Sequence, residues 1–141
     1  MELVQITSNN LFYIHRFLKY KSQISQFFRY FNTRTPQTAI LNHLYTLVCV
    51  NEDDEPVGYG HLDAENQIWL GICVYEAYKG CGIGNQIMLA LLTFADTNHL
   101  PLHLTVDKEN TIAKEMYERR GFSISKETET SFTMIRKVKG E

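Results

Sequence analysis

Three glycines at alternate positions, Gly80, Gly82 and Gly84, lie between two apolar runs of different periodicity. The run from Ile68 to Val74 is rich in strand-forming residues, whereas apolar residues recur at helical spacing from Gln86 to Ala95. The segment therefore predicts a strand, a tight turn and a helix in succession. Glycine N–H groups can approach an anion closely, and at a helix N-terminus they act together with the helix dipole. We expect this turn to bind the phosphates of a ligand.

Two common nucleotide-binding motifs do not fit this turn. A P-loop requires G-x-x-x-x-G-K-[ST], which does not occur in the sequence, and the run from Gly80 to Asn85 misses the G-x-G-x-x-G spacing of dinucleotide-binding proteins. The turn also follows a predicted antiparallel meander, instead of opening a first strand–helix–strand unit. ATP and NAD are therefore poor candidates for the ligand.

The size and composition of the chain fit a single domain over residues 1–141. Of the 141 residues 44% are hydrophobic, and the formal net charge of −2 gives no reason to expect nucleic acid or an anionic membrane as partner. No segment resembles a secretory signal or a membrane span, and the three cysteines form no C-x-x-C pair. We expect a cytoplasmic protein without a metal site.

The rest of the chain alternates strand and helix patterns, which predicts a mixed α/β (α+β) fold. A first strand is expected near Glu2 to Ile6, and apolar spacing between Leu11 and Phe31 predicts two helices with a break near Tyr20. Pro36 is expected to open a short helix. Three β-rich runs, Leu44 to Val50, Val57 to Asp63 and Gln67 to Val74, suggest an antiparallel meander. Later elements are expected at Leu100 to Val106, Glu109 to Gly121, Phe122 to Glu127 and Ser131 to Val138.

A second motif follows the glycine turn. Asn110, Ala113 and Tyr117 share one face of the predicted helix, and Gly121 and Phe122 then end the helix and start a strand. The pair of segments resembles the GNAT superfamily of N-acetyltransferases, whose second signature is Asn-x-x-Ala-x-x-x-Tyr-x-x-x-Gly-Phe. This chain matches every specified position of that signature.

The glycine turn matches the loop signature of the same superfamily, Arg/Gln-x-x-Gly-x-Gly/Ala, with one departure. Lys79 stands where the signature has arginine or glutamine. Because the loop's main donors are backbone N–H groups, this change should matter little. The resemblance covers Ile68 to Phe122 well. It implies the GNAT fold, with a mixed central sheet of about six to seven strands flanked by about four helices.

The resemblance implies that acetyl-CoA is the bound ligand and the acetyl donor. The end of the strand before the turn would pair its backbone with the pantetheine arm, and the turn would hold the diphosphate. Asn110 would bond the pantetheine or a nearby backbone group. The implied acetyl-CoA-binding residues are Ile72, Cys73, Val74, Lys79, Gly80, Cys81, Gly82, Ile83, Gly84, Asn85 and Asn110.

The same resemblance places Tyr117 near the CoA sulfur as general acid for the departing thiolate. Several superfamily members carry a glutamate base five residues before the motif asparagine, but that position is Thr105 here. We take His61 as the catalytic candidate, because a neutral histidine suits proton removal at physiological pH. A water chain remains an alternative, as do three other side chains, Asp63, Glu76 and His103.

The acceptor is expected between the N-terminal region and the central strands, with Arg29, Arg34, His43 and Asp63 as substrate-binding residues. This region also resembles acetyltransferases from bacterial surface-polysaccharide gene clusters, which implies an amino group on a nucleotide-linked sugar. Other small amines and protein N-termini or lysines remain open as acceptors. The alternative to an enzyme is a non-catalytic acyl-CoA-binding module. We expect a monomer or a homodimer.

Overall fold

The protein is described by a computed structural model that covers residues 1–138 and 140. Within this part of the chain, seven strands form one sheet in the order β1-β2-β3-β4-β5-β7-β6. The strands are β1 (Glu2–Gln5), β2 (His43–Val50), β3 (Pro56–Glu65), β4 (Gln67–Val74), β5 (Leu102–Asp107), β6 (Ser123–Glu127) and β7 (Ser131–Arg136). The α-helices are α1 (Phe12–Lys19), α2 (Pro36–Ala39), α3 (Ile83–Thr97) and α4 (Thr111–Arg119). The predicted mixed α/β fold is confirmed.

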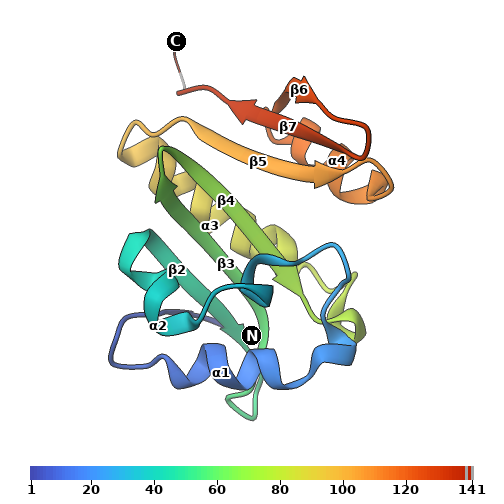
Figure 1. Cartoon of the computed structure of the whole chain (residues 1–141). Helices are drawn as coiled ribbons and strands as arrows, with labels where there is room; N and C mark the ends of the chain where they lie inside the picture. Colours follow the sequence, from blue (N-terminus) through green and yellow to red (C-terminus); the bar gives the residue numbers. More distant parts are fainter. Residues whose placement is uncertain (139, 141) are drawn as a thin grey trace.

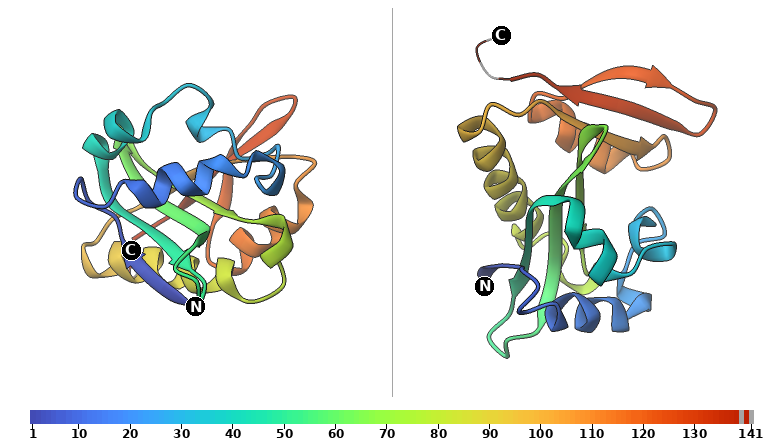
Figure 2. Two further views of the ribbon diagram at one scale, coloured as in Figure 1. Left: turned by 90° about the horizontal axis from the view of Figure 1, so that it is seen from below. Right: turned by 60° about the vertical axis from the view of Figure 1, so that its left-hand side comes forward.

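Helices cover both faces of the central strands (Figure 2). On β3, Gly58 and Gly60 face α3, and a Cβ atom at Gly60 would lie 2.4 Å from Cγ2 of Ile87. Because side chains alternate along a strand, Tyr59 points to the opposite face, where its ring lies 6.0 Å from that of Phe17 on α1. The glycines of β3 thus let α3 pack closely against the sheet.

The predicted meander is present, since β2, β3 and β4 pair antiparallel in sequence order. Strand β5 then pairs parallel to β4, and only Trp69 and His103 are in register. Beyond that pair the two strands diverge toward their carboxyl ends (Figure 1). Past that pair the two strands no longer bond to each other, and we call the unpaired region between them, at the end of β4 that precedes the glycine turn, the gap.

The second predicted N-terminal helix is absent, which corrects one expectation. After α1 ends at Lys19, the backbone forms only short 3₁₀ turns, at Lys21–Gln23 and Tyr30–Asn32. Phe28 lies 5.8 Å from the ring of Tyr59, and Tyr30 lies 4.2 Å from that of His61. On a helix, residues two apart point about 200° away from each other, so both rings could not reach the sheet. Contacts with β3 outweigh the helical periodicity of this segment.

No helix in the described part of the chain is long and apolar enough to cross a membrane.

Candidate active site

The free edge of β4 forms one wall of the gap between β4 and β5. The N–H of Tyr75 donates to the carbonyl of Val57, so in this antiparallel pair the odd-numbered residues of β4 bond to β3. Ile72 and Val74 therefore direct their N–H and C=O groups into the gap, where an extended ligand could add as a strand. The backbone of Cys73 faces β3 instead, so only its side chain can reach such a ligand.

The glycine turn joins the end of β4 to α3 by way of a 3₁₀ turn at Glu76–Tyr78. Gly80 and Gly82 have φ angles of +80° and +81°, which only glycine adopts without strain, and Gly82 is the N-cap of α3. Among the described residues, no acceptor is present for the backbone N–H groups of residues 80–85. These donors, together with the dipole of a 15-residue helix, form a cradle for an anion.

Two side chains at this cradle, those of Lys79 and Asn85, interact with charged neighbours. Lys79 forms an ion pair with Glu76 at 3.0 Å, and both side chains are at least half exposed. Arg120, at the C-terminal end of α4, donates a hydrogen bond to Oδ1 of Asn85. The motif analysis did not single out Arg120, although "ERRG" offers two cations at that helix end. This guanidinium lies beside the cradle and adds positive charge there.

The second motif lies on α4, with Tyr117 near Cys73 of β4. Asn110 is the N-cap of α4, and its side chain makes no capping hydrogen bond. Tyr117 is 9% exposed and packs edge-on against Phe122, with ring centroids 5.8 Å apart. In the described chain its hydroxyl has no hydrogen-bond partner and is not among the buried polar atoms without a partner, so this oxygen touches solvent. Burial, with a smaller effect of the Cys73 thiol, raises the pKa of Tyr117 to about 12.

A polar face lies on the side of the sheet covered by α1 and by residues 24–34, which we call the roof segment. Tyr59, His61 and Asp63 of β3 share this face with Gly71 and Trp69 of β4, because residues paired across strands point to the same side. Phe31 of the roof segment contacts Tyr59, with centroids 5.4 Å apart. His61 and Asp63 are both 2% exposed. Both therefore lie on the covered side of β3.

A chain of hydrogen bonds crosses this face from β2 to β3. The hydroxyl of Tyr30 donates to Oδ2 of Asp63 at 2.7 Å. Its oxygen must then accept from Nε2 of His43, also at 2.7 Å, and Nδ1 of His43 accepts from the hydroxyl of Thr46 at 2.7 Å. In this series of hydrogen bonds, each donor hydrogen therefore points in the direction of Asp63. Oδ1 of Asp63 remains buried and has no partner among the described residues.

The two histidines of the polar face are neutral at pH 7. Burial is the main cause that lowers the pKa of His43 to about 4. Burial, His43 and Arg34 together hold the pKa of His61 well below its usual value. Burial and the hydrogen bond to Asp63 raise the pKa of Tyr30, so its phenol keeps its proton. A weakly basic His61 is a poor proton acceptor, which counts against the expected role as base.

The two arginines expected to bind substrate are already paired with carboxylates. Arg29 donates twice to Asp107 at the end of β5, at 3.0 and 3.1 Å. This pair lines a cavity of about 340 Å³ between the roof segment and the hairpin of β6 and β7. Arg34 lies 4.3 Å over the ring of Tyr30 and 3.7 Å from Glu65. His43 and Asp63 join the polar face, whereas Arg29 is bonded to Asp107 of β5.

The other candidate bases lie apart from the hydrogen-bonded chain. His103 is on β5, with its ring 5.5 Å from that of Trp69, where β4 and β5 meet. Its Nδ1 is buried without a partner in the described chain, and burial lowers the pKa of His103. Glu76 is paired with Lys79 beside the glycine turn. Thr105 lies on β5, opposite Thr133 of β7.

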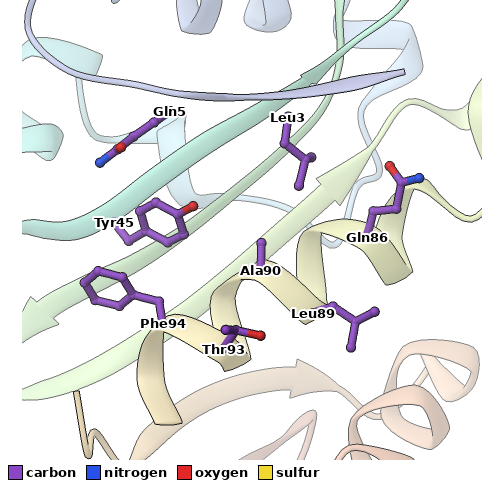
Figure 3. A pocket seen from close by; sticks show the side chains of 8 residues that line it. All are labelled: Leu3, Gln5, Tyr45, Gln86, Leu89, Ala90, Thr93 and Phe94. Carbon is purple, nitrogen blue, oxygen red and sulfur yellow. The ribbon is translucent and has the colours of Figure 1, made fainter. Parts of the chain in front are cut away.

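A larger cavity, of about 660 Å³, lies on the other side of the sheet (Figure 3). It is bounded by β1, β2 and α3, and the rings of Tyr45 and Phe94 stack beside it at 4.8 Å. Neither Tyr117 nor any residue of the glycine turn lines it. Across the described residues, no group of three or more His, Cys, Asp or Glu side chains is placed to hold a metal ion.

Comparisons with known proteins agree with the fold described above. A family model described as "Acetyltransferase (GNAT) domain" matches residues 18–139. No curated protein matches the chain significantly. A ribosomal-protein-alanine N-acetyltransferase from Escherichia coli has a TM-score of 0.74 at 16% identity, over 99% of this chain and 96% of that one.

Two solved structures with bound ligands are also similar. A phosphinothricin acetyltransferase from Sinorhizobium meliloti in complex with AcCoA has a TM-score of 0.76 at 15% identity, over 97% of this chain and 88% of that one. The PaiA N-acetyltransferase from Thermoplasma acidophilum in complex with coenzyme A has a TM-score of 0.71 at 17% identity, over 96% and 98%. At such identities the likeness shows a shared fold.

Proposed function

The chain belongs to the GNAT acetyltransferase family and is therefore an acyltransferase, and we propose that it acts as a single domain that transfers acetyl from acetyl-CoA to a primary amine of a small molecule. The observation that supports this proposal is the presence of three features near the end of β4. These are the free backbone edge of Ile72 and Val74, the N–H cradle of residues 80–85, and the solvent-touching hydroxyl of Tyr117. The glycine turn follows β4 directly, and the Cys73 thiol is close enough to Tyr117 to affect its pKa.

In this proposal the N–H groups of the cradle hold the diphosphate, and the positive end of α3 adds to their effect. The free backbone N–H and C=O groups of Ile72 and Val74 form hydrogen bonds with the pantetheine amides. Cys73 contacts the same arm through its side chain. Cys81, Ile83 and Asn85 contribute backbone donors, and the side chain of Lys79 adds positive charge at the start of the turn. The unbonded side chain of Asn110 completes the contacts. The bound thioester supplies the activated acetyl group. Tyr117 donates to the sulfur as it becomes a thiolate.

The polar face favours a cationic amine as acceptor. Oδ1 of Asp63 is an unpaired acceptor of a buried carboxylate, and an isolated buried charge is costly unless a ligand or water pairs with it. An ammonium group supplies both the charge and the hydrogen-bond donors. The aromatic rings of Tyr30, Phe31 and Trp69 around this face suit the aliphatic part of such a molecule.

A nucleotide-linked amino sugar is a second candidate acceptor. It is favoured by Arg29, whose side chain is 57% exposed beside the cavity at the end of β5. To bind phosphate, however, Arg29 must leave Asp107, and Arg34 must leave Glu65. A protein N-terminus or lysine would need the same polar face to admit a longer chain. Because of these costs, we rank a small cationic amine as the first candidate acceptor.

Thermal unfolding in the presence of ligands tests the acetyl-CoA site. At 100 times its Kd, a ligand stabilises the folded chain by about 2.7 kcal/mol, which raises Tm by roughly 5 to 10 °C at this size. We expect acetyl-CoA and CoA to give this shift, and ATP and NAD to give none at equal concentration. A shift with ATP or NAD and none with either CoA species would overturn the proposal.

Asp63→Asn tests the acceptor site. Removing the charge should raise KM for a cationic amine about 10- to 100-fold, the worth of a hydrogen bond to a charged group, with Kd for acetyl-CoA unchanged. Glu65→Gln is the matched control, because it removes a carboxylate from the exposed end of the same strand. Steady-state kinetics at fixed acetyl-CoA give both values. Equal KM values in the two variants would remove Asp63 from the acceptor site.

A further inference from the structure

Tyr59 and His61 form a buried hydrogen-bonded pair on β3. The hydroxyl of Tyr59 lies 2.7 Å from Nδ1 of His61, and neither side chain is more than 2% exposed. The rings of Phe17, Phe28 and Phe31 surround that of Tyr59 at centroid distances of 5.4 to 6.0 Å. The hydroxyl of Tyr59 is therefore held in an apolar setting where water does not replace a missing partner.

This setting decides where the protons lie. Within the described chain, Nδ1 of His61 is the only acceptor that the Tyr59 hydroxyl meets. If Nδ1 carried a proton and donated to the oxygen of Tyr59, the hydroxyl proton would be buried without an acceptor, which folded proteins rarely tolerate. Tyr59 must then be the donor. A neutral imidazole that accepts at Nδ1 carries its own proton on Nε2.

Nε2 of His61 points toward β4 at Gly71. A Cβ atom on Gly71 would lie 2.6 Å from Nε2, so only glycine leaves room for the imidazole there. Nε2 has no partner in the described chain and is not one of the buried polar atoms that lack one, so it touches solvent. Gly71 directly precedes Ile72, whose backbone N–H points into the gap. The N–H of His61 is thus free for a ligand beside the edge of β4.

We propose that Tyr59 is a positioning residue that holds His61 in its Nε2–H form, so that His61 donates a hydrogen bond to the carbonyl oxygen of the bound thioester. The identity of that ligand rests on the proposed function. His61 keeps its proton throughout, and its N–H stabilises the negative charge that develops on this oxygen as the amine adds. It is therefore a donor: as the C–N bond forms and the C–S bond breaks, the thiolate leaves beside Tyr117 and the proton released by the amine passes to solvent water.

The position of the proton is measured directly by NMR. Long-range ¹H–¹⁵N spectra of the ¹⁵N-labelled full chain at pH 7 distinguish the two neutral tautomers and the imidazolium, and His61→Gln identifies the His61 signals by their loss. We expect a protonated Nε2 and an unprotonated Nδ1. In Tyr59→Phe the signals should move toward a mixture of tautomers. A protonated Nδ1 in the wild type, or an unchanged spectrum in a folded Tyr59→Phe, would overturn the proposal.

Kinetics separate a donor from a base. Glutamine places an amide N–H close to the position of Nε2 and cannot act as a base, whereas methionine has similar length and no donor. We expect His61→Gln to keep at least 10-fold more kcat than His61→Met, with equal Kd for acetyl-CoA. Equal loss in both variants would identify a base, and no loss in either would remove His61 from catalysis. The NMR result needs no activity, so it stands even if the chain transfers no acetyl.

Discussion

Tyr117→Phe should lower kcat about 100-fold and leave Kd for acetyl-CoA nearly unchanged. The phenol has no hydrogen-bond partner in the described chain, so its donor is free for the sulfur. Because burial raises its pKa to about 12, Tyr117 is protonated at any physiological pH. A thiol has a pKa of about 8.5, so we expect the phenol to act mainly through a hydrogen bond to the developing thiolate.

The stability of this variant separates its effect from misfolding. Removing a hydroxyl that bonds to no protein group leaves no partner unsatisfied, so Tm should not fall. Tyr13→Phe is a suitable control, because it removes a hydroxyl that donates to Asp54 at the surface, and its kcat should equal that of the wild type. Wild-type kcat in Tyr117→Phe would exclude the phenol from the reaction.

Gly82→Val should weaken acetyl-CoA binding about 100-fold. A side chain at a φ of +81° costs about 1–2 kcal/mol, and a β-branched one costs more, so the turn rotates its N–H groups away from the cradle. Isothermal titration with acetyl-CoA measures the change in Kd, while circular dichroism shows that α3 is intact.

Gly84→Ala is the matched control for that variant. Its Cβ would lie 3.6 Å from Cγ2 of Val74, an ordinary contact, and Gly84 does not have a positive φ. Alanine should therefore keep Kd for acetyl-CoA within about threefold of the wild type, well short of the tenfold that 1.4 kcal/mol represents. If both variants bind equally well, the cradle is not the diphosphate site.

Local patterns were enough to predict the elements that carry the motifs. The strand before the glycine turn, the helix after it and the helix bearing Tyr117 lie within a few residues of their expected bounds. Each depends on the periodicity and end signals of a short window. The Asn110 to Phe122 motif indicated the family for the same reason, since its residues lie close together in the sequence, on α4 and at its two ends.

The polar face could not be predicted to the same degree, because its contacts join distant parts of the chain. Tyr30 and Asp63 are 33 residues apart, and their hydrogen bond depends on a roof segment whose spacing suggested a helix. The pairing of Arg29 with Asp107 spans 78 residues. The tautomer of His61 likewise depends on how its hydroxyl neighbour is buried. These contacts depend on tertiary packing, which cannot be predicted from a single sequence.

Acetyl transfer itself tests the central claim most directly. The purified chain is incubated with ¹³C-acetyl-CoA and a panel of small primary amines, while free thiol and the mass of each amine are followed. We predict thiol release that depends on an amine, with the labelled acetyl on its nitrogen and about 100-fold slower release by Tyr117→Phe. It would contradict the account if thiol were released at the same rate with each amine as without any, and if no labelled product formed.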